Sequence, residues 1–299
     1  MSQSLKLLQG LVVASYGKRY EVELADASSN STRRISCVTR GKKTDLACGD
    51  IVSIQLTDKA EGVVESSQAR SSLLYRSSAI KSKILAANVT QIIIVLATQP
   101  SFYEALLNRC LVAAEAAQIK PLIVLNKCDL AEVDDAKNKL QLYQNLGYAV
   151  LHLSAKQDIS ELKPYLKNHR SVLVGQSGMG KSTIINALLP DQNVRTQVMS
   201  QALDSGKHTT TAAHLYHLSQ TSSLIDSPGL QEFGLNHLSN EEIELAFKEF
   251  RPYLGKCRFN NCKHTHEPDC AIINAVNAGK ISMVRLGFYQ DLAKELRLN

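Results

Sequence analysis

One short segment constrains the fold more than any other part of the chain. The apolar run SVLV over residues 171–174 leads into the pattern Gly175-x-x-x-x-Gly180-Lys181-Ser182, and a helical sequence follows. Glycines let backbone N–H groups turn toward phosphate oxygens, and the helix N-terminus adds a favourable partial charge. The lysine reaches the β- and γ-phosphates, and the serine hydroxyl ligates magnesium. A glycine-rich turn with a chance lysine is the alternative, but it leaves the flanking strand and helix unexplained.

The loop therefore predicts a nucleotide site. We expect its contacts to come from Gly175, Gln176, Ser177, Gly178, Met179, Gly180, Lys181, Ser182 and Thr183.

The sequence around this loop alternates between buried strands and helices. From residue 90 onward QIIIVLAT is a continuous apolar run, which is typical of a strand buried on both faces. The helical pattern YEALLNRCLVAAEAAQ, the strand PLIVLN, a helix around 132–146 and the strand YAVLHLS come next, and then the short helix DISELKPYLKNH. This alternation predicts a parallel α/β sheet.

The two ends of the chain have different patterns. Residues 1–70 contain the short strand-like segments LVVASYG, RYEVELAD, RISCVTRG and DIVSIQLT, which predict a small β-barrel. The pattern does not distinguish a five-stranded oligonucleotide-binding barrel from an SH3-like one. After Gly234 the segments NEEIELAFKEF, CAIINAVNAGK and MVRLGFYQDLAKELRL predict helices.

Composition limits the classes of function. A length of 299 residues suggests two or three domains, and no apolar run approaches the roughly 20 residues that span a bilayer. The N-terminus lacks a basic region and a small-residue cleavage site, so we expect a cytoplasmic protein without a signal peptide. The net charge is +6, with five basic residues between Arg33 and Lys43, and eight basic against four acidic residues beyond Phe250. These basic flanks favour a nucleic-acid partner, although a solvated surface is the alternative for any one run.

Two motifs upstream of the phosphate loop predict which base is bound. Asn126-Lys127-Cys128-Asp129 ends the strand PLIVL and has the N-K-x-D form of the guanine-reading motif of GTPases. The Asp129 carboxylate can accept from the ring N–H and the exocyclic amino group of guanine, a donor pair that adenine lacks. The segment Ser154, Ala155 and Lys156 closes the next strand and resembles the companion loop whose backbone N–H meets the guanine oxygen.

Two further motifs lie downstream of the phosphate loop. Asp226-Ser227-Pro228-Gly229 ends the strand SLID and matches D-x-x-G, whose Asp supports the magnesium shell and whose Gly N–H meets the γ-phosphate. The segment GKHTTT over residues 206–211 offers a threonine ligand for magnesium, which we assign to Thr210 with Thr209 and Thr211 as alternatives. In ordinary GTPases N-K-x-D and S-A-K come last, whereas here they come first. The sequence therefore predicts a circularly permuted GTPase domain, in which the second switch leads directly into the C-terminal segment.

A cysteine cluster predicts a metal site. The spacing Cys257-x₄-Cys262-x-His264-x₅-Cys270 offers a Cys₃His ligand set, and sulfur ligands favour zinc. On spacing alone His266 competes with His264, and three free cysteines with chance histidines remain the alternative. Four protein ligands leave no open position, so the site is expected to be structural rather than catalytic.

Together these features resemble the ribosome small-subunit-dependent GTPase A family, also called RsgA or YjeQ. The resemblance covers almost the whole chain and includes RGKK, CGD-I-V, ILAANVTQ, GKHTTT and CRFNNCKHTHEPDCAI. It implies an oligonucleotide-binding barrel over 1–72, a circularly permuted GTPase domain over 73–233 and a helical zinc-binding module over 234–299. It also implies His264 as the fourth ligand of one structural zinc, and magnesium bound with GTP.

The resemblance further implies what the chain acts on and how. It implies a monomeric GTPase that binds the 30S subunit and 16S rRNA in late maturation, is stimulated by the subunit and leaves after hydrolysis to GDP. The position after D-x-x-G is Leu230, which cannot orient water, and the family implies His208 as the catalytic substitute; a packing role for His208 is the alternative. An RNA-binding module with a structural nucleotide, and an ATP-using kinase or metal chaperone, are the rival functions.

Overall fold

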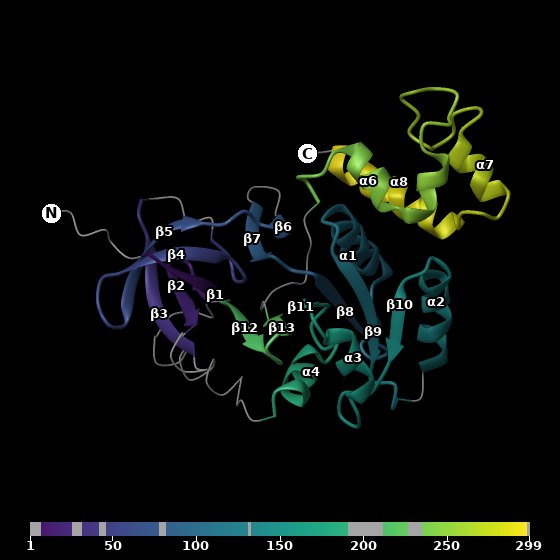
Figure 1. Cartoon of the computed structure of the whole chain (residues 1–299). Coiled ribbons are helices and arrows are strands. Elements are labelled where there is room, and N and C mark those ends of the chain that lie inside the picture. Colours follow the sequence, from purple (N-terminus) through teal and green to yellow (C-terminus); the bar gives the residue numbers. More distant parts are fainter. Residues whose placement is uncertain are drawn as a thin grey trace.

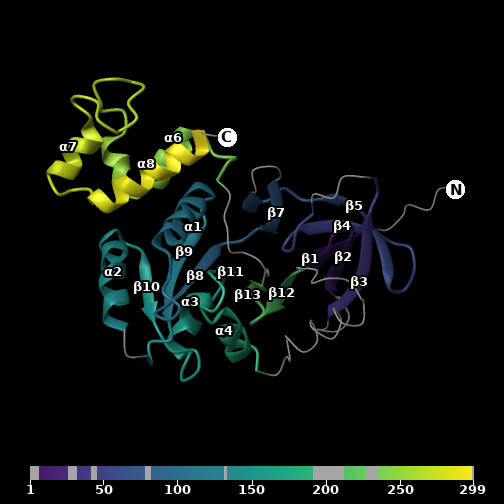
Figure 2. The same cartoon turned by 180° about the vertical axis from the view of Figure 1, so that it is seen from behind.

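Three regions are visible in the computed structural model of the chain (Figure 1). The structure describes residues 7–25, 32–41, 46–77, 82–130, 133–190, 212–226 and 235–297. A β-barrel lies at one side, an α/β sheet occupies the middle, and a helical module lies over the helices of that sheet on the side away from the barrel; the view from behind shows the same arrangement (Figure 2). Within the described residues no helix has both the length and the apolar character to cross a bilayer.

The N-terminal region is a closed five-stranded barrel. Its strands are β1 (Leu8–Tyr16), β2 (Arg19–Ala25), β3 (Thr32–Thr39), β4 (Ile51–Leu56) and β5 (Glu61–Ser67). Strand β1 pairs with both β2 and β4, and β3 runs parallel to β5, so the order β1-β2-β3-β5-β4 closes on itself. This is the oligonucleotide-binding type of barrel rather than the SH3-like type. The sequence pattern missed β5, because EGVVESS has only two β-branched residues.

A short hairpin follows the barrel, and the sequence pattern did not predict it. It consists of β6 (Leu73–Ser77) and β7 (Ser82–Ala87), which pair antiparallel to each other. Its polar and charged residues obscure the alternation that marks a half-buried strand.

The central sheet carries the predicted parallel strands. These are β8 (Gln91–Ala97), β9 (Lys120–Asn126), β10 (Ala149–His152), β11 (Arg170–Val174) and β13 (Ser223–Asp226), with β12 (Ala213–His217) antiparallel beside β13. The spatial order is β10-β9-β8-β11-β13-β12. The helical elements are α1 (Glu104–Ala116), α2 (Val133–Asn145), η1 (Ser160–Leu162), α3 (Lys163–Leu166) and α4 (Lys181–Leu188). Every residue of β8 is buried, as its apolar run predicts.

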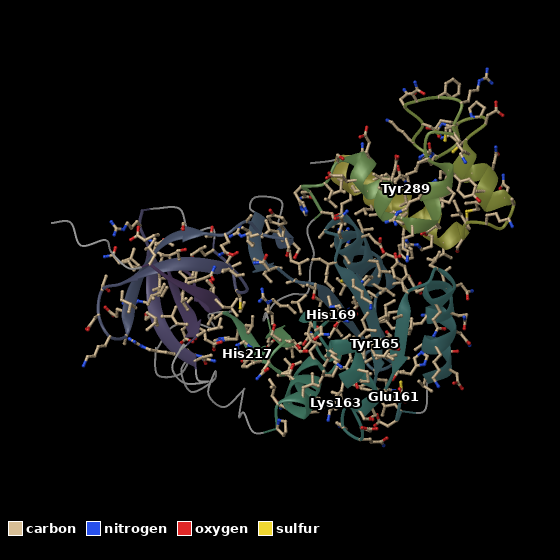
Figure 3. All side chains as sticks on the ribbon, viewed as in Figure 1. Glu161, Lys163, Tyr165, His169, His217 and Tyr289 are labelled. Carbon is tan, nitrogen blue, oxygen red and sulfur yellow. The ribbon has the colours of Figure 1, made fainter. Side chains whose placement is uncertain are left out.

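The central sheet and the barrel form one continuous hydrogen-bonded sheet, which the sequence did not reveal. Strand β12 pairs antiparallel with β1, so that Ala14 lies opposite His214. Next to this pairing, His217 Nε2 lies 2.6 Å from Oε1 of the buried Glu23 of the barrel. Figure 3 shows His217 at this junction, far from Tyr289 of the helical module. Main-chain pairing and an ionisable pair therefore fix the barrel to the α/β sheet.

The C-terminal module contains α6 (Asn240–Ala246), η2 (Lys248–Tyr253), α7 (Ala271–Asn277) and α8 (Met283–Arg297). Helix α6 begins with a capping box: Ser239 Oγ accepts from Glu242 N at 3.2 Å, and the Glu242 carboxylate accepts from Ser239 N at 2.7 Å. The helical segment predicted over NEEIELAFKEF is present in two parts, because the chain leaves the α-helical conformation at Phe247 and continues in the 3₁₀ helix η2. This break lets the Phe247 and Phe250 rings lie 5.0 Å apart in the core, and Pro252 limits any α-helical continuation.

A buried arginine joins this module to the α/β domain. Arg285 of α8 is fully buried, and its Nε lies 2.5 Å from Glu249 Oε1. The same guanidinium donates to Asn108 Oδ1 on α1, and Asn108 Nδ2 donates to the Tyr143 hydroxyl on α2 at 2.9 Å. The Arg285–Glu249 ion pair lies within the module, and the hydrogen bond of Arg285 to Asn108 connects the module to α1.

Candidate nucleotide and metal sites

The phosphate loop lies where its motif predicts, between β11 and α4. Gly175 has φ 146°, and a Cβ there would lie 2.3 Å from the main-chain oxygen of Val95 on β8. Gly180 has φ 91°, and a Cβ there would lie 2.3 Å from Asn126 Nδ2. Glycine is therefore required at both ends of the loop by a left-handed backbone and by close neighbours. Lys181 Nζ donates to the carbonyl oxygens of Gly175 and Gln176 at 2.6 and 2.7 Å, which holds the ammonium group against the loop.

Asn126 joins the phosphate loop to the two base-reading motifs. Its Nδ2 donates to the Met179 carbonyl oxygen at 2.9 Å, and its Oδ1 accepts from the Ala155 N–H at 2.9 Å. The side chain is only 2% exposed, so both of its ends are satisfied within the protein. One buried amide thus connects the phosphate loop, the N-K-x-D motif and the segment 154–156, which are separate in sequence. Loops at the carboxyl ends of parallel strands are expected to meet in this way.

The residues predicted to read guanine follow β9 at the same edge. Lys127 has φ 62°, and its Nζ donates to the Gln99 carbonyl oxygen at 2.6 Å. The Asp129 carboxylate is exposed, and the adjacent Ser154 hydroxyl together with the backbone and Lys156 holds its pKa below the usual value. Asp129 therefore stays ionised at neutral pH, the form that accepts two hydrogen bonds from a base.

One supporting segment was missed by the sequence analysis. The loop that follows β8 contacts the phosphate loop: Tyr103 N donates to Gln176 Oε1 at 2.9 Å, and a Cβ on Gly178 would meet Pro100 at 3.2 Å. The strand order could have identified this segment. Strands β8 and β11 are neighbours in the sheet, and the strands that follow them in the chain lie on opposite sides of this pair. Ligands bind at such a switch point of an open α/β sheet.

The structure describes only some of the residues that are predicted to bind magnesium or to form the switches. Ser182 and Thr183 lie in the first turn of α4, and Asp226 ends β13, which is parallel to β11 with Val172 opposite Ile225. Because β11 and β13 are parallel, the loop that follows β11 and Asp226 at the end of β13 lie at the same edge of the sheet. Gly229 and Leu230, His208 and the threonines at 209–211 lie outside the described residues.

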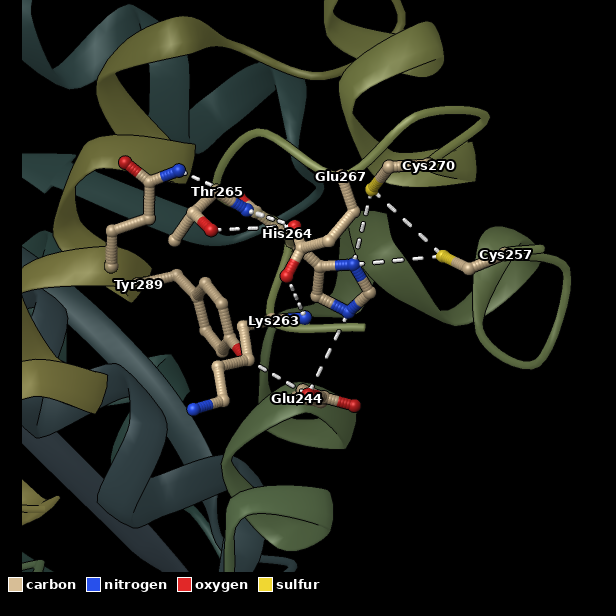
Figure 4. Close-up of polar contacts among 9 residues, drawn as sticks. Glu244, Cys257, Lys263, His264, Thr265, Glu267, Cys270 and Tyr289 are labelled. Carbon is tan, nitrogen blue, oxygen red and sulfur yellow. Dashed lines mark hydrogen bonds and ion pairs between the residues drawn. The ribbon is translucent and has the colours of Figure 1, made fainter. Parts of the chain in front are cut away.

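The four predicted metal ligands converge in the C-terminal module, and Figure 4 shows three of them, Cys257, His264 and Cys270. One ligand atom from each of Cys257, Cys262, His264 and Cys270 lies within 4.8 Å of the others. The two sulfurs of Cys257 and Cys270 are 3.9 Å apart, and His264 Nδ1 lies 3.6 and 3.3 Å from them. A tetrahedral site with Zn–S bonds of about 2.3 Å separates two sulfurs by about 3.8 Å, so the cluster fits such an ion.

The loop conformation explains why His264 rather than His266 belongs to this cluster. The Glu267 carboxylate accepts from the N–H groups of Lys263 and Thr265 at 2.8 and 2.9 Å, and from that of His266. Although burial raises the pKa of Glu267, these backbone donors lower it to about 2. The resulting tight turn leaves His264 buried and His266 exposed.

Comparison with known proteins agrees with this architecture. The family model described as RsgA GTPase matches residues 67–236. The small ribosomal subunit biogenesis GTPase RsgA of Nitrosospira multiformis is 52% identical over 293 residues, which are 98% of this chain and 92% of that protein. The protein of the same name from Burkholderia pseudomallei is 48% identical over 292 residues, 96% of this chain and 92% of that protein.

Two solved structures share the fold over nearly the whole chain. YjeQ from Thermotoga maritima has a TM-score of 0.76 at 30% identity, with 97% of this chain and 99% of that chain covered. YloQ, described as a circularly permuted GTPase, has a TM-score of 0.72 at 28% identity, with 99% and 98% covered. In this chain too, the base-reading strands β9 and β10 precede the phosphate-loop strand β11. On its motifs, its permuted strand order and these similarities, the chain belongs to the RsgA GTPase family.

Proposed function

We propose that the chain is a GTP-hydrolysing switch that binds the 30S subunit during its late maturation and leaves it after hydrolysis to GDP and phosphate. The observation that carries the proposal is the buried Asn126 amide, which bonds to both the phosphate loop and the Ala155 N–H. Recognition of the base and binding of the phosphates are thereby coupled in one rigid site. The names of the relatives supply the connection to the small ribosomal subunit.

Each motif residue has a proposed role. The backbone of Gly175–Thr183 surrounds the phosphates, Lys181 neutralises charge on the β- and γ-phosphates, and Gly229 donates its N–H to the γ-phosphate. Ser182 and Thr210 hold magnesium, with Asp226 supporting its shell; the ion neutralises phosphate charge when bound. Asp129 accepts from guanine, beside Asn126, Lys127 and the segment 154–156.

His208 is proposed to position the attacking water. The position that follows D-x-x-G in this chain is Leu230, whose side chain has no polar atom. A neutral imidazole can orient water at neutral pH, which makes His208 the candidate in the adjacent switch segment. Slow turnover without a partner is expected, because the subunit is then needed to order this segment.

The Cys₃His cluster is proposed to hold one structural zinc. Three thiolates and an imidazole suit zinc better than magnesium or calcium, and four protein ligands leave no open position for a substrate. Cys257, Cys262, His264 and Cys270 would therefore stabilise the fold of the module rather than take part in hydrolysis.

The three-part division and the partners complete the proposal. We assign residues 1–72 to the barrel, 73–233 to the GTPase domain and 234–299 to the zinc module. The barrel and the zinc module supply basic residues that bind 16S rRNA, and the protein acts as a cytoplasmic monomer. Two linked modules raise affinity through their effective concentration, provided that both reach the RNA together.

Turnover measurements with and without purified 30S subunits test this function. We expect the subunit to raise the rate of GTP hydrolysis, and we expect cosedimentation to be stronger with a non-hydrolysable GTP analogue than with GDP. By linkage, a subunit that binds the GTP state better must also raise the affinity for GTP. Equal pelleting in both nucleotides and an unchanged rate would instead favour an RNA-binding module in which nucleotide is only structural.

A further inference from the structure

The His264 imidazole lies between cysteine sulfurs on one side and a carboxylate on the other (Figure 4). Its Nδ1 faces the sulfur atoms, at 3.3 Å from Cys270 Sγ and 3.6 Å from Cys257 Sγ. Its Nε2 lies 3.6 Å from Oε1 of Glu244 on α6. A nitrogen that binds a metal must carry no proton, so coordination through Nδ1 leaves the proton on Nε2, where it faces the carboxylate.

Glu244 is itself fixed by a second helix. The Tyr289 hydroxyl on α8 donates to the same Oε1 atom of Glu244 at 2.9 Å. Tyr289 is 1% exposed, and its ring packs edge-on against Phe247 and Phe250 at 5.6 and 5.3 Å. The neighbouring Gln290 donates from Nε2 to the main-chain oxygen of His264 at 2.6 Å. The carboxylate thus stands between a buried phenol and the imidazole.

We propose that Glu244 is a positioning residue of the metal site, which selects the His264 tautomer that coordinates through Nδ1 and is held in place by Tyr289. The inference rests on the proposed zinc site. Its physical basis is that a histidine ligand whose second ring nitrogen donates to a carboxylate is fixed in orientation and made more basic. Because Glu244 lies on α6 and Tyr289 on α8, metal binding also connects these two helices.

The inference is tested by the zinc affinity of the full-length protein, measured in competition with a chromophoric chelator. Loss of such a carboxylate partner costs about 10- to 100-fold in metal affinity, and we expect that loss for Glu244→Gln. Tyr289→Phe should weaken zinc binding in the same direction but by less, and the effects of the two substitutions should not add in the double variant. Glu241→Gln removes the same charge from an exposed position on α6 and should leave the affinity unchanged.

A spectroscopic signature separates positioning from general loss of stability. Long-range ¹H–¹⁵N NMR correlations of the zinc-loaded wild type should show His264 protonated at Nε2 and bound to metal at Nδ1. A metal bond at Nε2, or equal zinc affinity in Glu244→Gln and Glu241→Gln, would overturn the inference alone. Wild-type protein that binds no zinc would overturn the zinc site itself and the inference with it.

Discussion

The predicted nucleotide-binding residues that the structure describes are spread over residues 126–226, whereas the four candidate metal ligands lie within Cys257–Cys270. The first set is positioned by the packed strands β8, β9 and β11, and the buried Asn126 links its loops. Between Tyr253 and Ala271 the described metal loop contains no helix or strand. The comparison teaches that packed strands position the nucleotide site, whereas the candidate metal ligands lie on one loop that is held by local hydrogen bonds such as those of Glu267.

The largest effect is expected when the metal loop loses a ligand. Cys262→Ser should reduce zinc from about one per chain to none and should unfold the C-terminal module, because metal binding and local folding are one equilibrium. GTP binding should persist, since its site is shaped by the sheet. Metal analysis, circular dichroism and nucleotide titration measure these three properties.

Cys37→Ser is the matched control, because this thiol lies in the barrel, outside both the metal cluster and the nucleotide motifs. A Cys262→Ser protein that lost GTP binding in parallel would show that the two regions do not fold independently, and an intact module without zinc would contradict the dependence on metal.

The next effect concerns base selectivity. GTP and GDP should bind while ATP does not compete, because unpaired polar groups can cost a mismatched base up to ~10⁴–10⁵ in discrimination. Asp129→Asn should weaken guanine and favour xanthine, whose 2-position carries oxygen. Zinc content should not change. Competition titrations measure these affinities, with Asp134→Asn on the exposed face of α2 as the control. Displacement of GDP by ATP at comparable concentration would refute the guanine assignment.

A smaller effect is expected in the rate of hydrolysis. His208→Ala should spare GTP binding and lower turnover by about 10²-fold, the scale of one lost acid–base or positioning group. Lys181→Ala should instead impair both binding and turnover, since it removes a phosphate contact. Single-turnover assays measure the rate of hydrolysis, with His266→Ala as the histidine control. An undiminished rate in His208→Ala would show that another group positions the attacking water.

The smallest effect sharpens the comparison itself. Asn126→Ala leaves the Met179 carbonyl and the Ala155 N–H without this partner, and we expect nucleotide affinity to fall by about 10- to 100-fold. Zinc content and the fold of the metal module should stay as in the wild type. Calorimetric titration with GDP measures the affinity, and Asn145→Ala, at an exposed position, is the control. An unaltered affinity in Asn126→Ala would mean that packing alone aligns the loops.

Local chemistry was predictable from the sequence, and long-range pairing was not. The phosphate loop, N-K-x-D and the cysteine cluster each demand particular residues at fixed spacing, so they stand out wherever they occur. The hydrogen bonds of Asn126, by contrast, depend on how β9 and β11 are placed. The pairing of β1 with β12 involves main-chain groups that any residue carries, and Arg285 looks like a surface residue until α8 is placed on α1.

The β1–β12 pairing has a consequence for how this protein can be divided. A barrel on a flexible tether could be removed without harm to its neighbour, but here its removal would strip β12 of its partner along one side. The newly exposed main-chain groups at Ala213 and His214 would form the kind of edge that recruits strands from other chains. We therefore expect a variant that lacks the barrel to self-associate more than the full-length chain, which analytical ultracentrifugation would measure.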